Sequence, residues 1–336
     1  MAMPDFLVIG APKAGSTALH VALHRHPQIY MSATKEPKFF LTDGPPPSKG
    51  GPGDAKTYRE HVWRRDDYEA LFDPAPPGTR RGESTTLYLG TPAAHRRIAA
   101  AVPEARLVAI LRDPVDRAHS NWTHLFSAGL EPESDFLKAC SLEPERLAKG
   151  WAPFWGYTTL GRYGEQLTSL FDHFPRDQVL VLTYRELRND PAATLDRICA
   201  HIGVETGIVT EIPSENVTAA VSPSPVNQAL RRVLRTGSGI GDRLARVLPD
   251  AARERVSGTT TRLLQREQRR RLPLTPEQHA ALVPAFDEDI RRLESLLGRS
   301  FDHWRDPNNA LRPPLEHAGQ FGTGYRSIDR PVAGRT

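Results

Sequence analysis

The chain has 336 residues, of which 39% are hydrophobic and 25% charged, so it can bury a substantial core. Its net charge of +4 is unevenly placed, because twelve arginines and only four acidic residues lie between residues 231 and 271. It has no apolar run of membrane-spanning length, and two cysteines cannot form a disulfide framework. Composition thus excludes a membrane-spanning protein, a disulfide scaffold and a disordered chain, and favours a cytoplasmic location.

Short apolar runs typical of buried strands alternate with segments of helical periodicity. Strands are predicted at residues 5–10, 106–111 and 178–183, and helices at 16–25, 92–101, 114–128, 161–173 and 190–201. This alternation requires crossover connections, which favour an α/β fold with a mainly parallel sheet. From 226 to 297 only helices are expected, the last at 277–297, and residues 306–336 are expected to form an irregular tail.

A glycine-bearing turn at residues 10–17 (GAPKAGST) joins the first predicted strand to the first helix. Backbone N–H groups at such a junction favour a phosphate, to which Lys13 adds positive charge and Ser16 adds a hydroxyl donor. The lysine lies two residues before Gly15, which distinguishes the turn from a Walker A loop. An ordinary turn with Ser16 as the N-cap is the alternative. The predicted anion-binding residues are Lys13, Ala14, Gly15, Ser16 and Thr17.

A second candidate anion site follows the strand predicted at 106–111. Arg112 stands at the carboxyl end of this strand, where open α/β sheets bind ligands, and its guanidinium suits a phosphate. Ser120, about two turns along the next helix, can add a hydroxyl from the same side. A surface ion pair, either of Arg112 with Asp116 or of Asp113 with Arg117, is the alternative.

The two motifs together resemble the 5′-phosphosulfate loop and the 3′-phosphate motif of sulfotransferases, which use 3′-phosphoadenosine 5′-phosphosulfate (PAPS). Further segments are similar to bacterial and carbohydrate-type members: 35–40 (KEPKFF), 82–88 (GESTTLY), 161–163 (GRY), 181–187 and 274–304. They occur in the family's order, so the resemblance covers about residues 5–305. It implies a P-loop-like three-layer fold in a domain of residues 1–305, with PAPS as donor, adenosine 3′,5′-bisphosphate (PAP) as product, and no metal.

The resemblance also implies roles for individual residues. Sulfuryl transfer needs the donor and acceptor to be positioned, negative charge to be neutralised, and a base for the acceptor proton. Lys13 would stabilise the negative charge that develops on the bridging oxygen of the donor. Glu36 would remove the acceptor proton, with Glu83 in reserve; a surface carboxylate paired with neighbouring lysines is the alternative for Glu36. Tyr163 is a candidate phosphate ligand or, alternatively, a core aromatic.

The chain departs from the family pattern at two places. Ser84 follows Gly-Glu where carbohydrate-type members often have a lysine. Residues 216–225 lack the cation that a later family loop often carries. Either Arg231 or Arg232 substitutes for it, or the contact is absent. Cytosolic small-molecule members use a histidine as the base, in the region that corresponds to residues 80–89. This region contains no histidine here, which favours the carbohydrate-type members, in which a glutamate is the base.

We therefore expect a sulfotransferase that acts on a hydroxyl of a sugar, glycolipid or natural product. Its partner would be a small-molecule, glycolipid or carbohydrate acceptor, with no nucleic acid and at most peripheral membrane contact. One alternative is a P-loop kinase or NTPase in which Asp113 holds Mg²⁺. The other is a non-enzymatic basic module that binds an acidic polymer through residues 231–271.

Overall fold

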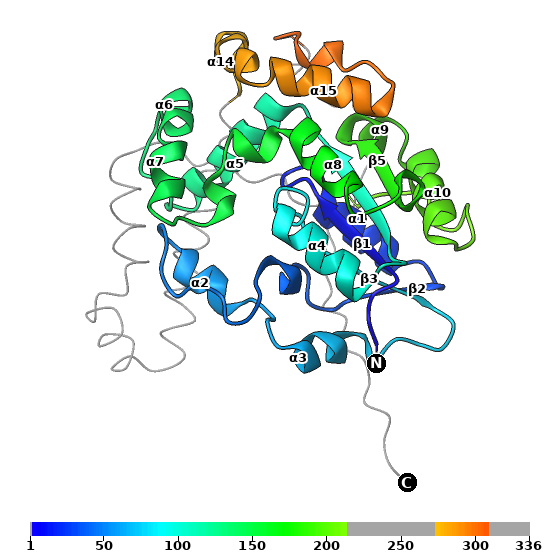
Figure 1. Ribbon diagram of the computed structural model, residues 1–336. Helices are drawn as coiled ribbons and strands as arrows, with labels where there is room; N and C mark the ends of the chain where they lie inside the picture. Colours follow the sequence, from blue (N-terminus) through cyan, green and yellow to red (C-terminus); the bar gives the residue numbers. More distant parts are fainter. Residues whose placement is uncertain (1, 214–272, 309–336) are drawn as a thin grey trace, which may run out of the picture.

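A computed structural model of the chain describes residues 2–213 and 273–308 (Figure 1). Its centre is a five-stranded sheet in the order β2-β3-β1-β4-β5, in which every pairing is parallel. The strands are β1 (Phe6–Gly10), β2 (Ile29–Met31), β3 (Arg80–Ser84), β4 (Arg106–Leu111) and β5 (Val179–Thr183). The parallel sheet expected from the alternating pattern is confirmed.

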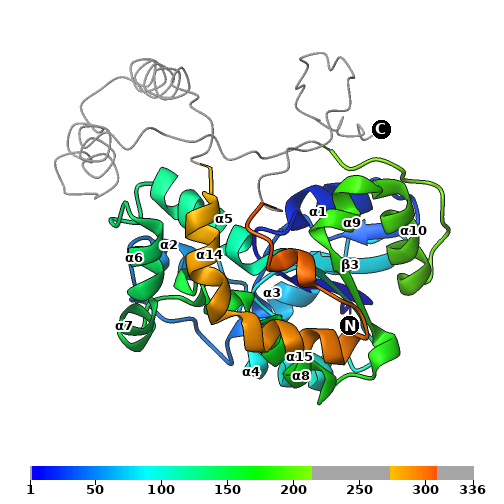
Figure 2. The ribbon, with the colours of Figure 1, turned by 90° about the horizontal axis from the view of Figure 1, so that it is seen from above.

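Helices cover both faces of the sheet, with α1 and α10 on one face and α4 and α8 on the other (Figures 1 and 2). The helices before residue 213 are α1 (Ser16–His24), α2 (Asp54–Arg59), α3 (Arg65–Glu69), α4 (Pro92–Ala101), α5 (Pro114–Ser127), α6 (Phe136–Ser141), α7 (Glu143–Ala148), α8 (Tyr163–Phe171), α9 (Tyr184–Asn189) and α10 (Pro191–Ile202). After residue 273 come α14 (Pro276–Leu282) and α15 (Asp287–Leu297). None of the helices in these ranges is long and apolar enough to cross a membrane.

The five helices predicted before residue 203 agree with the structure to within two residues at each end. The single helix predicted at 277–297 is wrong, because a 3-10 turn at Val283–Ala285 separates α14 from α15. Pro284 explains the break, since it has no N–H for the helical hydrogen-bond ladder. The helices expected between 226 and 272, and all but the first residues of the tail expected at 306–336, lie outside the described residues.

Neither β2 nor β3 is among the predicted strands, since β2 has only three residues and β3 has no apolar run. The five residues of β3 (RRGES) include four that are polar, yet Gly82, Glu83 and Ser84 are all buried. A Cβ on Gly82 would lie 2.1 Å from the ring of Phe6, so the glycine lets this β1 side chain pack against β3. β3 is therefore built from packing with β1 rather than from its own hydrophobicity.

The parallel sheet brings distant segments to one edge. All five strands end there, so the turn after β1, the end of β3, Arg112 after β4 and Tyr184 after β5 are neighbours in space. Behind this edge, β1 and all of β4 after its first residue are buried. Open α/β sheets bind ligands at this edge, and the candidate site is built here.

Candidate active site

The turn after β1 presents backbone N–H groups at the carboxyl edge of the sheet. Gly15, not Ser16, is the N-cap of α1, with φ of 88°, and a Cβ there would lie 3.0 Å from Cε2 of Tyr184. Glycine is thus required both for the left-handed backbone and for the space. Because glycine has no side chain that could cap the helix, the first N–H groups of α1 are left for an external acceptor. Ser16 is the first helical residue and is buried.

Arg112 joins the two predicted anion sites. Its Nη1 donates a hydrogen bond to the carbonyl oxygen of Lys13 at 2.7 Å, and its Cζ lies 4.8 Å from the ring centre of Tyr184. Nε and Nη2 bind Oδ2 of Asp116 at 2.6 and 2.5 Å. The ion pair of Arg112 with Asp116 that the alternative interpretation expects is therefore present, with the arginine side chain only 11% exposed, and phosphate binding by Arg112 stays a prediction. Burial opposes the charge of Arg112, but the Asp116 carboxylate holds the pKa of Arg112 above its ordinary value.

The other alternative, a pair of Asp113 with Arg117, is wrong. Asp113 is the N-cap of α5, and its Oδ1 accepts the N–H groups of Val115 and Asp116 at 2.9 and 3.0 Å. Its Oδ2 lies 3.2 Å from Nε2 of His279 in α14. Asp113 therefore holds α5 and the C-terminal helices in place, and both of its carboxylate oxygens are engaged.

Ser120 and Tyr163 are the remaining predicted phosphate ligands, and both follow Arg112 in the sequence. Ser120 is half-buried in α5. Tyr163, the first residue of α8, is 1% exposed and donates its hydroxyl to the carbonyl oxygen of Arg112 at 2.9 Å. Burial raises the pKa of this hydroxyl. Tyr163 thus braces the backbone of Arg112, while phosphate contact by either residue stays a prediction.

Glu36 lies at the same edge, on the loop after β2. Its backbone has φ of 58°, and its N–H donates to the carbonyl oxygen of Ser84 at 3.0 Å. Its Oε1 accepts from Thr86 Oγ1 at 2.9 Å and from Lys35 Nζ at 3.1 Å. The side chain is 24% exposed, so solvent and an acceptor can reach the carboxylate. The lysine pairing of the alternative interpretation is present, but it leaves the carboxylate at the edge of the sheet.

Glu83 is held differently, inside the protein. It is fully buried and accepts hydrogen bonds from Tyr68 at 3.2 Å and from Thr85 at 2.9 Å. Burial raises the pKa of Glu83 to about 7, against the opposing effect of these hydrogen bonds, and the nearby Glu36 adds to the rise. A carboxyl group without solvent access is poorly placed to meet an acceptor, which favours Glu36 as the base.

His20 was missed by the sequence reasoning. It lies on α1, one turn after Ser16, and its Nδ1 is 3.0 Å from Oγ of Ser84 at the end of β3. The i, i+4 spacing from Ser16 was the available signal, since it places the imidazole on the same helix face as the predicted anion site. Without knowledge of β3, nothing linked His20 to Ser84.

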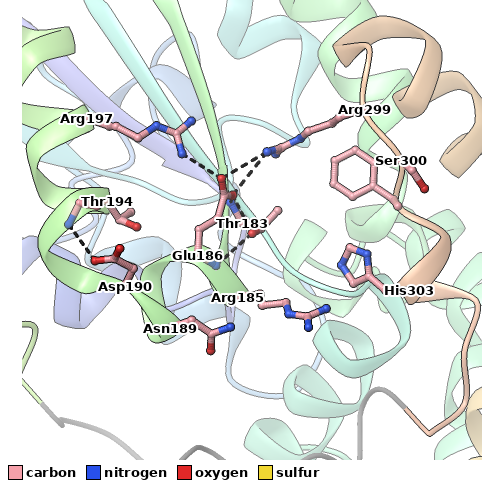
Figure 3. Close-up of a pocket in the computed structure, with 12 residues that line it drawn as sticks. Thr183, Arg185, Glu186, Asn189, Asp190, Thr194, Arg197, Arg299, Ser300 and His303 are labelled. Carbon is pink, nitrogen blue, oxygen red and sulfur yellow. Dashed lines mark hydrogen bonds and ion pairs between the residues drawn. The ribbon is translucent and has the colours of Figure 1, made fainter.

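A cavity of about 460 Å³ lies beside these motifs, at the carboxyl end of β5 (Figure 3). Glu186 bridges two of its arginines, at 2.9 Å to Arg197 and 3.4 Å to Arg299. Its lining comes from the end of β5, from α9 and α10, and from the segment 299–303. The cavity therefore flanks the two anion motifs rather than containing them.

Comparison with known proteins agrees with this geometry. A family model described as "Sulfotransferase family" matches residues 4–207. The chain is 29% identical over 222 residues to the Bifunctional heparan sulfate N-deacetylase/N-sulfotransferase 3 of Homo sapiens, covering 60% of the chain and 22% of that protein. It is 28% identical over 209 residues to the Heparan sulfate glucosamine 3-O-sulfotransferase 3B1 of Mus musculus, covering 62% and 48%. The chain thus spans less than half the length of either relative.

The fold also matches a solved structure. The sulfotransferase from Alicyclobacillus acidocaldarius is 27% identical, with a TM-score of 0.69, and the match covers 91% of this chain and 100% of that one. The match therefore extends beyond residue 207, where the family model ends.

Proposed function

The chain belongs to the sulfotransferase family, and we propose that it transfers a sulfuryl group from PAPS to a hydroxyl group of a carbohydrate. One observation carries this proposal. The hydrogen bond between Arg112 and the carbonyl oxygen of Lys13 unites two anion-binding motifs that lie about a hundred residues apart in the sequence. A ligand with two anionic groups, as PAPS has, is the ligand that such a pair of motifs suits.

The proposed donor contacts follow from the two motifs. The N–H groups at the start of α1, the side chain of Lys13 and the hydroxyls of Ser16 and Thr17 would hold the phosphosulfate. Arg112 and Ser120 would hold the 3′-phosphate. The left-handed glycine at position 15 supports this assignment, because it begins α1 without a side-chain cap for the first N–H groups of the helix.

The proposed reaction is an in-line displacement at sulfur. The acceptor oxygen forms a bond to sulfur while the bond between sulfur and the bridging oxygen breaks, and PAP leaves with that oxygen. The carboxylate of Glu36 takes the acceptor proton, and the charge of Lys13 stabilises the negative charge that develops on the leaving oxygen. Accessibility supports Glu36 over Glu83, since only Glu36 is open to an acceptor.

A carbohydrate acceptor is favoured over a small natural product or glycolipid by the relatives. Both curated relatives reported above are named for heparan sulfate. A hydroxyl within a glucosamine-containing saccharide is accordingly the first acceptor to test.

The kinase or NTPase alternative is disfavoured by Asp113. Its two carboxylate oxygens are occupied by the start of α5 and by His279, so it is not free to hold Mg²⁺. The alternative of a basic polymer-binding module rests on residues 231–271, which lie outside the described residues.

Isothermal titration tests the proposal. The chain should bind PAP tightly in EDTA, and Arg112→Ala should weaken this binding at least tenfold, because the variant loses the cation at the end of β4. Tight binding of ATP that needs Mg²⁺, with no binding of PAP, would contradict the proposal.

A further inference from the structure

His20 links three elements at the carboxyl edge through one imidazole. Its Nδ1 lies 3.0 Å from Oγ of Ser84, and the backbone of Ser32, just after β2, lies close enough to the ring to influence its pKa. The N–H of Ser32 donates to the carbonyl oxygen of Gly82 at 2.8 Å, so the carbonyl oxygen of Ser32 is the backbone group that can accept from the imidazole. The ring therefore connects α1 with the ends of β2 and β3.

The protonation state of His20 fixes the direction of these hydrogen bonds. Burial, together with the positive charge of Lys35 and the neighbouring His24, lowers the pKa of His20 to about 4, and Glu36 only partly opposes this. The imidazole is neutral near pH 7 and has one donor and one acceptor. When Nδ1 accepts the hydroxyl proton of Ser84, the single proton of the neutral ring is on Nε2.

Ser84 in turn holds the loop that carries Glu36. Its carbonyl oxygen accepts the N–H of Glu36 at 3.0 Å, and Thr86, two residues further on, donates to the carboxylate of Glu36 at 2.9 Å. Glu36 has a left-handed backbone, with φ of 58°, which surrounding contacts must maintain. Both the backbone and the carboxylate of Glu36 therefore depend on where the 84–86 segment lies.

We propose that His20 is a positioning residue for the reaction, which fixes Ser84 and through it the carboxylate of Glu36. The inference rests on the proposed function, in which Glu36 is the base that takes the acceptor proton. It also gives a role to the serine at position 84, where a lysine would be expected from the family resemblance. In this chain a neutral pair of imidazole and hydroxyl sets the position of the carboxylate.

Substitution of His20 should separate turnover from donor binding. We expect His20→Leu to lower kcat about 10- to 100-fold, the size of effect that a small misplacement of a catalytic group produces. The dissociation constant of PAP should stay within about twofold of the parent value, because the turn at Lys13 and Arg112 is untouched. His20→Asn, whose amide can replace Nδ1, should recover most of the lost kcat.

A double-mutant cycle tests whether His20 acts through Ser84. Ser84→Ala should lower kcat as much as His20→Leu, and the double variant should be no worse than either single variant. His24→Asn is the matched control, because this histidine lies one turn further along α1 and is exposed, and it should keep the parent kcat.

The assay is release of PAP from PAPS with desulfated heparan sulfate as acceptor. Parent kcat in His20→Leu, additive effects of the two substitutions, or a loss of PAP affinity equal to the loss of kcat would each overturn the inference. The last result would mean that His20 only supports the fold of the donor turn. If the parent itself releases no PAP, the proposed function is wrong. If the parent is active and the His20 variants have the same kcat as the parent, only the positioning role is wrong.

Discussion

Gly15→Ala is the substitution that tests the donor turn most sharply. Gly15 has φ of 88°, and its added Cβ would lie 3.0 and 3.1 Å from two ring carbons of Tyr184. Alanine in the left-handed region costs roughly 1–2 kcal/mol. The contact with Tyr184 adds to this cost, because the tyrosine ring must move to make room for the new Cβ. That movement disturbs Arg112, whose guanidinium lies 4.8 Å from the centre of the ring.

Gly78→Ala is the matched control for the backbone strain. Gly78 has a similar φ of 82°, but a Cβ there would meet no atom within 4 Å. Both variants should lose roughly 1–2 kcal/mol of unfolding free energy in urea from the backbone alone. Only Gly15→Ala should raise the dissociation constant of PAP, by at least about tenfold, or about 1.4 kcal/mol, in isothermal titration.

If Gly15→Ala binds PAP as tightly as Gly78→Ala does, the turn does not hold the donor through its backbone, and the packing of Tyr184 against it has no bearing on binding.

Three further predictions concern charged side chains. Lys13→Ala should lower kcat with PAPS about 100-fold or more, because the leaving oxygen loses its neutralising charge; a kcat within threefold of the parent would contradict this role. Glu36→Gln should also lower kcat about 100-fold or more in steady-state assays, while the dissociation constant of PAP stays within about twofold; normal turnover would remove Glu36 as the base. Glu83 has a pKa raised to about 7, so its burial should reduce stability progressively as the pH rises from about 4.5 to 7. Glu83→Gln should cancel that loss, so that its unfolding free energy in urea rises by roughly 3 kcal/mol relative to the parent between pH 5 and pH 8. A difference in unfolding free energy that does not change with pH would refute the raised pKa of Glu83.

Local patterns carried the predictions that the structure confirmed. The runs of β1 and β4 are apolar because these strands lie inside the sheet, and the run of β5, at the edge of the sheet, is apolar and buried or half-buried throughout. The turn at residues 10–17 has its glycine and lysine within one short segment. Arg112 is predicted as an anion ligand because it directly follows such a strand, and that role stays a prediction. These features need no knowledge of distant partners, so the sequence alone contains them.

Other parts depend on contacts between distant segments. β3 is polar and forms because Phe6 packs over Gly82. Asp113 pairs with His279, 166 residues away, and His20 with Ser84, 64 residues away. Hydrophobic periodicity holds no information about such pairs. The break at Pro284 was a local signal that the apolar pattern of residues 277–297 outweighed.

The most direct test of the central claim is to incubate the chain with radiolabelled PAPS and desulfated heparan sulfate in EDTA, and to quantify both products. Sulfuryl transfer predicts that label enters the saccharide and that PAP appears in an equal molar amount without added metal. No label in the saccharide, together with consumption of ATP that requires Mg²⁺, would contradict the claim.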